Sequence, residues 1–204
     1  YLGSRSRGNG SRGRTSGNVP SSASYQTGGS HGGLGGRTGS TPTYGDFRQP
    51  ALPGAGGTGY NRSSSSYRGG DGGGALRVDV EDVFVLDGRL LANGARGGRY
   101  DAGGAGGSIW VDAGTLRRAR TGLAMQADGG YGYYAAGGGG RIAVYYGRLD
   151  GLSVTPAMVS ADGGNSRSSS QRGGSGTIFY QQDAETSGRL LIDSRNNYVS
   201  RAGP

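Results

Sequence analysis

The chain lacks cysteine and lysine, and it is poor in large apolar residues. Its 204 residues include 48 glycines, and hydrophobic residues make up only 32%. Without cysteine, neither a disulfide framework nor a cysteine-ligated zinc site can form. No apolar run approaches the roughly 18 residues that cross a bilayer, so we expect no membrane span. An average domain uses about 45–50% apolar residues with glycine counted. Here glycine supplies much of that count and buries little surface, so this composition argues against a conventional thick core.

The positive charge is concentrated in the first third of the chain. All 22 basic residues are arginines. Residues 1–70 hold eight arginines and one acidic residue, Asp46, whereas residues 71–204 hold 14 arginines and 13 acidic residues. The first third therefore supplies +7 of the net +8. We interpret residues 1–27 as a basic Gly/Ser/Arg-rich arm, and residues 28–204 as the folded part, with the clearest repeats at 69–194.

The folded part repeats with a period near 34 residues. In each copy a glycine-rich tract leads directly into a strand-like segment, as in GGGGRIAVYY at 137–146. Strand side chains alternate between two faces, so the first and third strand positions predict two inward columns. These columns are Leu76, Ile109, Ile142 and Ile178, at spacings of 33, 33 and 36, and Val78, Val111, Val144 and Tyr180. The residues between them, Arg77, Trp110, Ala143 and Phe179, are expected to face outward.

A second short strand is expected later in each copy, followed by an Asn-Gly or Asp-Gly pair. Such pairs tolerate a positive φ, so they predict sharp turns. The predicted turn residues are Asn93, Gly94, Asp128, Gly129, Asp162 and Gly163. A loop of about a dozen residues, mostly Gly, Ser, Arg and Tyr, then leads back to the next copy, with its glycines forming the return corner of a coil.

Two short strands and a long loop in each period indicate a solenoid. Helical repeats of similar length are excluded, because no ten-residue window has a period of 3.6 and glycine interrupts every segment. We therefore predict an all-β fold, a right-handed parallel β-helix or β-solenoid with coils of about 34 residues and long glycine-rich return loops. Neither terminus shows a polar capping element, so we expect open ends.

Several motifs resemble a known kind of repeat. GGSIWVDAGTL, GGGGRIAVYY, GTIFYQ and RLLIDS, with the earlier SHGGLGG and PTYGDFRQPALPGAGG, look like the glycine-rich β-helix repeats of large secreted surface, matrix or appendage proteins, flagellar hairs among them. The resemblance covers about residues 28–194. It implies a parallel β-helix and an extracellular scaffold role, and it implies no catalytic residues.

Three RGG triplets, at 68–70, 96–98 and 172–174, raise the alternative of an RGG-type RNA-binding protein, in which arginine pairs with phosphate and tyrosine stacks on bases. They share one phase of the repeat, and residues 71–204 are nearly neutral, so we favour structural loops in which arginine stacks on tyrosine.

Chemistry at a metal or an acid pair has little support in the sequence. The calcium-binding pattern G-G-x-G-x-D fits residues 129–134 until its last position, which is Tyr134. Asp79, Glu81 and Asp82 lie close together, as the acid pair of a polysaccharide-cleaving enzyme would. The single histidine lies far from them in sequence, at position 31. We predict no enzyme activity and no cofactor, with Ca²⁺ as the only candidate ion.

Interfaces and modification sites are also expected. Tyrosine and arginine are favoured at protein contacts, and outward aromatic residues would form either a contact surface or a second layer of loops over the coils. The candidates for an interface are Arg5, Arg7, Arg12, Arg14, Trp110, Tyr131, Tyr133, Tyr134 and Phe179. The arm would become ordered by contact, either along its own solenoid or on a neighbouring subunit. Asn9 and Asn61 begin N-glycosylation sequons.

The sequence thus predicts a non-enzymatic structural subunit, or a segment of one, of an extracellular filament, appendage or matrix that works by self-association. A cell-surface adhesin module that binds a glycan or a partner protein is the alternative from another class, and RNA binding is the third.

Overall fold

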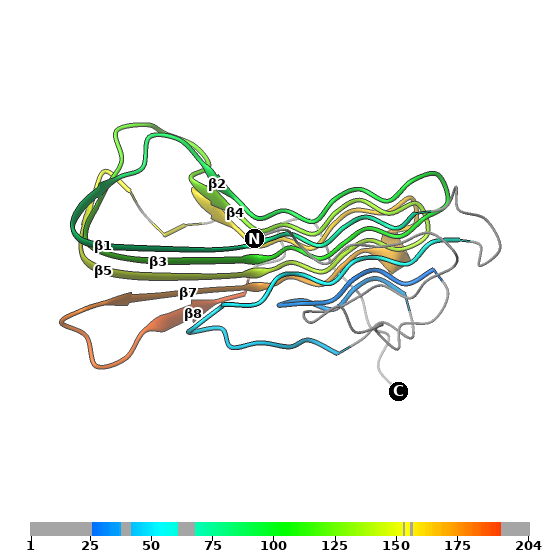
Figure 1. Cartoon of the computed structure of the whole chain (residues 1–204), viewed down its shortest axis with the longest axis horizontal. Coiled ribbons are helices and arrows are strands. Elements are labelled where there is room, and N and C mark those ends of the chain that lie inside the picture. The colour runs from blue at the N-terminus through cyan, green and yellow to red at the C-terminus, as the bar shows by residue number, and fades with distance from the viewer. Residues whose placement is uncertain (1–25, 38–41, 61–67, 153, 156, 193–204) are drawn as a thin grey trace.

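The structure, a computed structural model, describes residues 26–37, 42–60, 68–152, 154–155 and 157–192. Within these ranges there is no α-helix, and parallel strands stack coil upon coil, which confirms the predicted β-solenoid. The only helical element described is a short 3₁₀ turn, η2 (Ser169–Gln171). Figure 1 shows strands at one end of the long axis and wavy, unpleated segments at the other.

Two sheets form the strand half of the molecule. The large sheet has the order β1-β3-β5-β7-β8, and the small sheet has the order β2-β4-β6. The large sheet consists of β1 (Ala75–Val85), β3 (Ser108–Arg117), β5 (Arg141–Asp150), β7 (Thr177–Gln182) and β8 (Arg189–Leu191). The small sheet consists of β2 (Leu90–Leu91), β4 (Met125–Gln126) and β6 (Val159–Ser160).

The register of the large sheet follows the spacing of the repeat. Leu76 pairs with Ile109, Ile109 with Ile142 and Ile142 with Ile178, all between parallel strands. A thin core lies between the sheets, and Ile109, Val111, Ile142 and Val144 are completely buried in it. Ile178 is 4% exposed, and Val78 and Tyr180 are partly buried at the margin of the core. Leu76 is 37% exposed, because β1 is the first strand of the stack and no preceding coil is described that would cover it.

The glycine-rich tracts are not the predicted return corners of the coils. They form straight extended segments, which we call glycine helices, and each repeats its hydrogen bonding every third residue. For example, Gly103 and Gly106 donate to Ala135 and Gly138, both at 2.9 Å. A repeat of three residues, with hydrogen bonds made to neighbouring segments and not within the segment itself, is typical of a polyproline II helix. Segments 92–98, 127–132 and 161–165 lead away from the small sheet, and segments 69–74, 102–107, 135–140 and 172–176 return to the large sheet.

The glycine helices pack in three layers. The returning helices form the middle layer, the outgoing helices lie on one side of it, and the N-terminal segments 26–36 and 53–58 lie on the other. Helix 102–107 shows the result, because it bonds to helices 69–74 and 135–140 beside it, to 92–98 and 127–132 on one side, and to 26–36 and 53–58 on the other. Six bonded neighbours leave no room for side chains at the contacts. A Cβ on Gly137, for example, would lie 1.9 Å from the carbonyl oxygen of Gly104.

The predicted Asx-Gly turns are wrong. Gly94, Gly129 and Gly163 have no left-handed φ, and the chain runs straight from each short strand into an outgoing helix. Glycine is required there by close packing, since a Cβ on any of the three would lie 2.0 Å from a backbone oxygen.

The polar residues before these glycines connect successive coils. The Asn93 side chain donates to Gln126 (3.1 Å) and accepts from the Asp128 amide (2.8 Å). Asp128 Oδ1 accepts bonds from the Ser160 hydroxyl (2.6 Å) and the Asp162 amide (2.7 Å). These residues form a ladder along the stack, not a set of turns.

The outward face of the large sheet is also different from the prediction. Ala143 and Phe179 are buried, although the strand pattern placed them outside. Residues 44–53 cover this face, where Phe47 packs edge-on against Phe179 at 5.6 Å and Arg48 lies over the same ring. The expectation of a second layer over the coils thus describes the region correctly, but the layer comes from the N-terminal segment.

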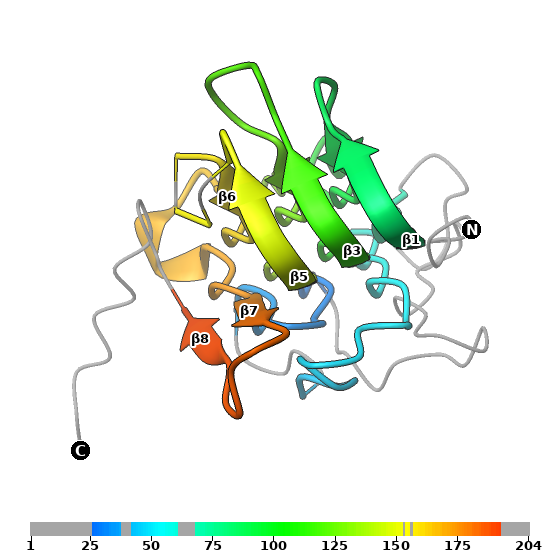
Figure 2. The same ribbon diagram turned by 90° about the vertical axis from the view of Figure 1, so that its left-hand side faces the viewer.

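The two ends of the stack differ. β8 pairs antiparallel with β7, so the chain reverses direction and ends the parallel series. This hairpin was not predicted from the sequence. At the other end, β1 has β3 on one side and no described strand on the other. The end views of the strands show β1 and β8 at opposite margins of the large sheet (Figure 2).

Candidate functional site

The three layers of glycine helices together form what we call the glycine bundle. Its tip, at the end farthest from the strands, brings together tyrosine and arginine side chains from several coils. The tip is where each outgoing helix turns into a returning one, at 99–101 in one coil and 133–134 in the next, and Tyr60 joins it from the N-terminal layer. Tyr60 stacks on Tyr134 at 5.8 Å, and Tyr100 lies 4.9 Å from Tyr133. Since all four rings are only half-buried, the cluster presents aromatic surface to solvent.

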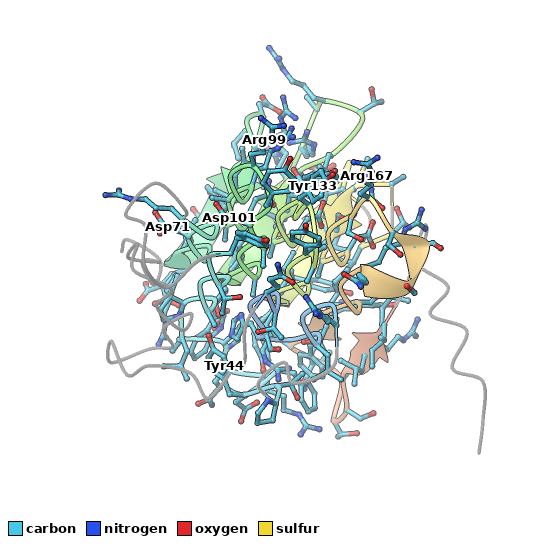
Figure 3. All side chains as sticks on the ribbon, turned by 90° about the vertical axis from the view of Figure 1, so that its right-hand side faces the viewer. Tyr44, Asp71, Arg99, Asp101, Tyr133 and Arg167 are labelled. Carbon is cyan, nitrogen blue, oxygen red and sulfur yellow. The ribbon has the colours of Figure 1, made fainter. Side chains whose placement is uncertain are left out.

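Arginines cover the exposed sides of these rings. Arg99 lies over Tyr100 at 5.0 Å and Arg167 over Tyr133 at 5.2 Å, and Arg167 also donates to the hydroxyl of Tyr133. Figure 3 looks onto this end of the molecule and shows Arg99, Tyr133 and Arg167 at its surface. Exposed cation–π pairs contribute only about 0.5–1 kcal/mol each, so these contacts stabilise the positions of the arginine side chains only weakly.

A buried carboxylate fixes the backbone of the tip. Asp101 is 1% exposed, and its two oxygens accept the amides of Tyr60 (2.8 Å) and Arg68 (2.9 Å). Burial raises the pKa of Asp101, and these two amide bonds oppose the rise. The carboxylate thus joins the N-terminal layer to the middle layer, beside Tyr100, whose φ of 69° is left-handed. No sequence pattern singled out Asp101, because its partners lie 33 and 41 residues away.

The RGG triplets take part in this bundle. Their glycines Gly69, Gly70, Gly97 and Gly173 are buried in glycine helices. Arg96 of the second triplet lies over the ring of Tyr131 at 4.6 Å. The buried glycines make the triplets part of the packed bundle, and the second triplet has the arginine–tyrosine contact that the structural interpretation expected.

The open end of the solenoid is a second candidate surface. β1 is an eleven-residue edge strand, and its column residue Leu76 is 37% exposed. Val83 and Val85 farther along β1 are 38% and 52% exposed, and Leu91 of β2 is 56% exposed. Long, apolar edge strands are templates for pairing with another chain.

Four acidic side chains line a groove on the outer face of the large sheet. Asp79, Asp112 and Asp183, with Glu81, border a hollow of about 440 Å³. Burial and then the charges of Asp183 and Asp79 raise the pKa of Asp112, while the nearby Arg77 lowers it. Asp79 is paired with Arg77 at 2.8 Å. Over the described residues, no group of three or more His, Asp or Glu side chains is arranged to hold a metal ion.

The remaining predicted interface residues are in different places. Tyr131, Tyr133 and Tyr134 lie at the tip, half-buried. Trp110 is half-buried on the outer face with Arg77 over its ring at 3.9 Å, and Phe179 is only 1% exposed, so it presents no free surface. Arg5, Arg7, Arg12 and Arg14, and the sequons at Asn9 and Asn61, lie outside the described residues. Of the predicted arm, only Gln26 and Thr27 are described, and both are buried in the glycine bundle.

No family model matches the chain, and no curated protein or solved structure is detectably similar to it. None of the described residues belongs to a helix that is long and apolar enough to cross a membrane. The function must therefore be argued from the tip of the glycine bundle and from the open end of the solenoid.

Proposed function

We propose that the chain is a non-enzymatic structural module of an extracellular filament, appendage or matrix, and that it associates with a second copy of itself through its open end. The observation that carries the proposal is the outer edge of β1, which pairs with no strand in the described part of the chain, and the core column that ends there at the exposed Leu76. The extracellular setting rests on the resemblance of the repeats to those of secreted scaffold proteins.

The apolar residues of the open end need a cover that fits the coil. Ile109 and Ile142 in the same column are completely buried, because each has a coil on both sides. Leu76 has a coil on one side only. Val78, Phe84 and Leu90 border the core. A partner that covered them, together with the exposed Leu76, would extend the hydrophobic core by one layer.

A second copy suits the end better than an unrelated protein does, because the end has two unlike halves. An edge strand adjoins the first glycine helices, at 69–74 and 92–98, and a partner must match both. Glycine helices accept neighbours only where the neighbour also lacks side chains, as the Cβ distance of 1.9 Å at Gly72 to the oxygen of Gly54 shows. A second copy of this chain meets both requirements, because its own open end has an edge strand that adjoins glycine helices.

The arrangement favours a two-fold pair over head-to-tail stacking. β8 closes the other end of the stack with an antiparallel strand, so a parallel coil cannot simply continue there. A two-fold axis would bring β1 against β1 of the second copy in antiparallel pairing. The glycine helices permit this, because they bond in both directions here: helix 53–58 runs antiparallel to 69–74, and 69–74 runs parallel to 102–107.

Sedimentation velocity of the Leu76→Lys and Val85→Lys variants tests the proposal. Lysine on an edge strand blocks pairing with another strand, so we expect the wild type to be dimeric at about 100 µM and both variants to be monomeric. Leu190→Lys is the matched control, because Leu190 is 47% exposed on β8 at the closed end. A monomeric wild type, or a Leu190→Lys variant that alone dissociates, would overturn the proposal. Val85 is 52% exposed, so its replacement should leave the fold intact if Leu76→Lys does not.

The tip supports a second candidate, an adhesin module that binds a glycan or a partner protein. Four tyrosine rings and two arginines converge there from four parts of the chain, and such residues are enriched at binding hot spots. Adhesion of coated beads to cell surfaces would test it with Arg99→Gln and Arg167→Gln. The exposed Arg148 of β5 gives the control, since Arg148→Gln changes the charge equally.

A further inference from the structure

The loops that follow β1 and β3 enclose a small pocket at the strand end of the molecule, away from both candidate surfaces. The pocket has a volume of about 300 Å³. Asp87 and Arg89 line it from the first loop, and Arg118, Arg120 and Thr121 line it from the second. Three arginines thus face one hollow with a single aspartate.

Arg118 occupies a position that belongs to the apolar core. The amides of Leu86 and Arg118 extend the strand ladder, donating to Arg117 O (2.9 Å) and Asp150 O (2.8 Å). Leu86 before it and Leu152 after it are buried members of the hydrophobic core. Arg118 is only 4% exposed, so a charge is buried at the position that Leu86 occupies in the preceding coil.

The guanidinium of Arg118 is bonded but not neutralised. It donates to the carbonyl oxygens of Leu86 (2.6 Å), Gly88 (2.7 Å) and Leu123 (3.2 Å). Its Nε has no hydrogen-bond partner within the described part of the chain, and no described carboxylate forms an ion pair with it. The one acid of the pocket, Asp87, accepts the amide of Ala119 at 3.0 Å. A buried charge without a counter-charge is costly, and carbonyl dipoles compensate it only in part.

We propose that this pocket binds an oxyanion, a sulfate or phosphate group, carried on a molecule of about the size of a monosaccharide. Arg89 and Arg120 would bond the oxyanion directly, since the arginine fork matches its geometry. The buried charge of Arg118 would attract the oxyanion from the wall of the pocket, and the hydroxyl of Thr121 would hydrogen-bond the part of the ligand that carries the oxyanion. A volume of about 300 Å³ is at the lower limit of ligand pockets and exceeds what a bare tetrahedral anion fills.

The structural role of Arg118 is separable from binding. Its three carbonyl bonds tie the two loops together, so replacing Arg118 would alter the fold whether or not a ligand binds. Arg89 and Arg120 are exposed, and neither forms an ion pair within the described ranges. Their removal should therefore affect the ligand alone.

Isothermal titration of the full chain with glucose 6-sulfate, glucose 6-phosphate, inorganic sulfate, inorganic phosphate and glucose tests the proposal. We expect one of the two sugar esters to bind with a dissociation constant below about 1 mM, and glucose not to bind. Arg89→Gln and Arg120→Gln should each weaken the binding about tenfold, the loss expected for one charge-assisted hydrogen bond. Arg148→Gln removes the same charge outside the pocket and should change nothing.

Three results would overturn the proposal. Binding of neither ester at about 10 mM would remove the site. An equal loss in Arg148→Gln would show that the net positive charge of the chain attracts anions without a site. Equal affinity for the inorganic anions would show that the sugar is not recognised, and would leave an adventitious ion only.

Discussion

Replacing Gly139 by alanine tests whether the glycine helices are packed as tightly as the structure shows. Gly139 lies in the returning helix 135–140. A Cβ there would be 2.0 Å from the carbonyl oxygen of Ala161 and 2.5 Å from the amide nitrogen of Gly176. These two atoms are themselves hydrogen-bonded at 2.7 Å, so one methyl group would press on an existing bond. Relief to an ordinary contact needs a shift of at least about 1 Å of backbone, not of a side chain.

The energetic cost can be estimated from the bonds at stake. The shift would weaken the bond from Gly176 to Ala161 and the bond from the Gly139 amide to Gly174, which is 2.9 Å long. A buried polar group left unsatisfied costs about 1–3 kcal/mol, and overpacking adds about 1–3 kcal/mol. We therefore expect a loss of about 2–6 kcal/mol, a large share of the 5–15 kcal/mol typical of a folded protein.

Urea unfolding and thermal melting followed by circular dichroism would measure the loss. For a domain of this size, about 3 kcal/mol corresponds to a melting point lower by roughly 10 °C. Gly88→Ala is the matched control, because a Cβ at Gly88 would meet nothing within 4 Å. Valine should enlarge the contrast, with Gly139→Val unfolding the protein and Ser169→Val, at an exposed site in η2, being tolerated. Equal stability of the Gly139 and Gly88 variants would refute close packing and make the glycine tract a flexible spacer.

Three further predictions concern single side chains. Val111→Asp should cost more than about 4 kcal/mol in urea unfolding, because Val111 is fully buried, whereas the exposed Asp112→Ala should be neutral. Burial lowers the pKa of His31 from 6.5 to about 4, so the unfolded state takes up the proton first, and stability should fall by about 3 kcal/mol between pH 6.5 and 4. His31→Gln should lose that part of the pH dependence. Asp101→Asn should cost about 2 kcal/mol, because the amide nitrogen cannot accept the backbone amide that one carboxylate oxygen now accepts.

The strand half of the fold could be predicted from the sequence because its information is local and periodic. Ile109, Val111, Ile142 and Val144 recur at a spacing of 33 and alternate with period 2, and both features follow from the geometry of stacked parallel strands. The cover over Phe179 could not be predicted in the same way. It depends on Phe47 and Arg48, which lie more than 130 residues earlier in the chain. No pattern within β7 distinguishes an outward residue exposed to solvent from one covered by another segment.

The candidate surfaces were predictable only in part. Aromatic and basic residues at the coil tips stood out in the sequence, but their convergence with Tyr60 depends on Asp101, whose two long-range bonds carry no local signature. The pocket around Arg118 was invisible for a different reason. Arginine after a strand normally lies at the surface, and only the register shows that Arg118 stands in line with Leu86.

The glycine half shows why composition alone was misleading. Glycine after Asp usually permits a left-handed turn, and the sequence around Asp128 and Gly129 was interpreted in that way. In the structure the same residue is needed for what it lacks, not for the φ that it tolerates, because a side chain at Gly129 would collide with the oxygen of Gly137. Both requirements select glycine, so one sequence cannot separate them. The two requirements are distinguished by the neighbouring segments. A turn requires no neighbouring segment, whereas a buried three-fold helix requires segments on every side to bond its backbone groups. The N-terminal segments 26–36 and 53–58 supply the outer neighbours of the middle layer, so a part of the chain outside the clearest repeats completes the bundle.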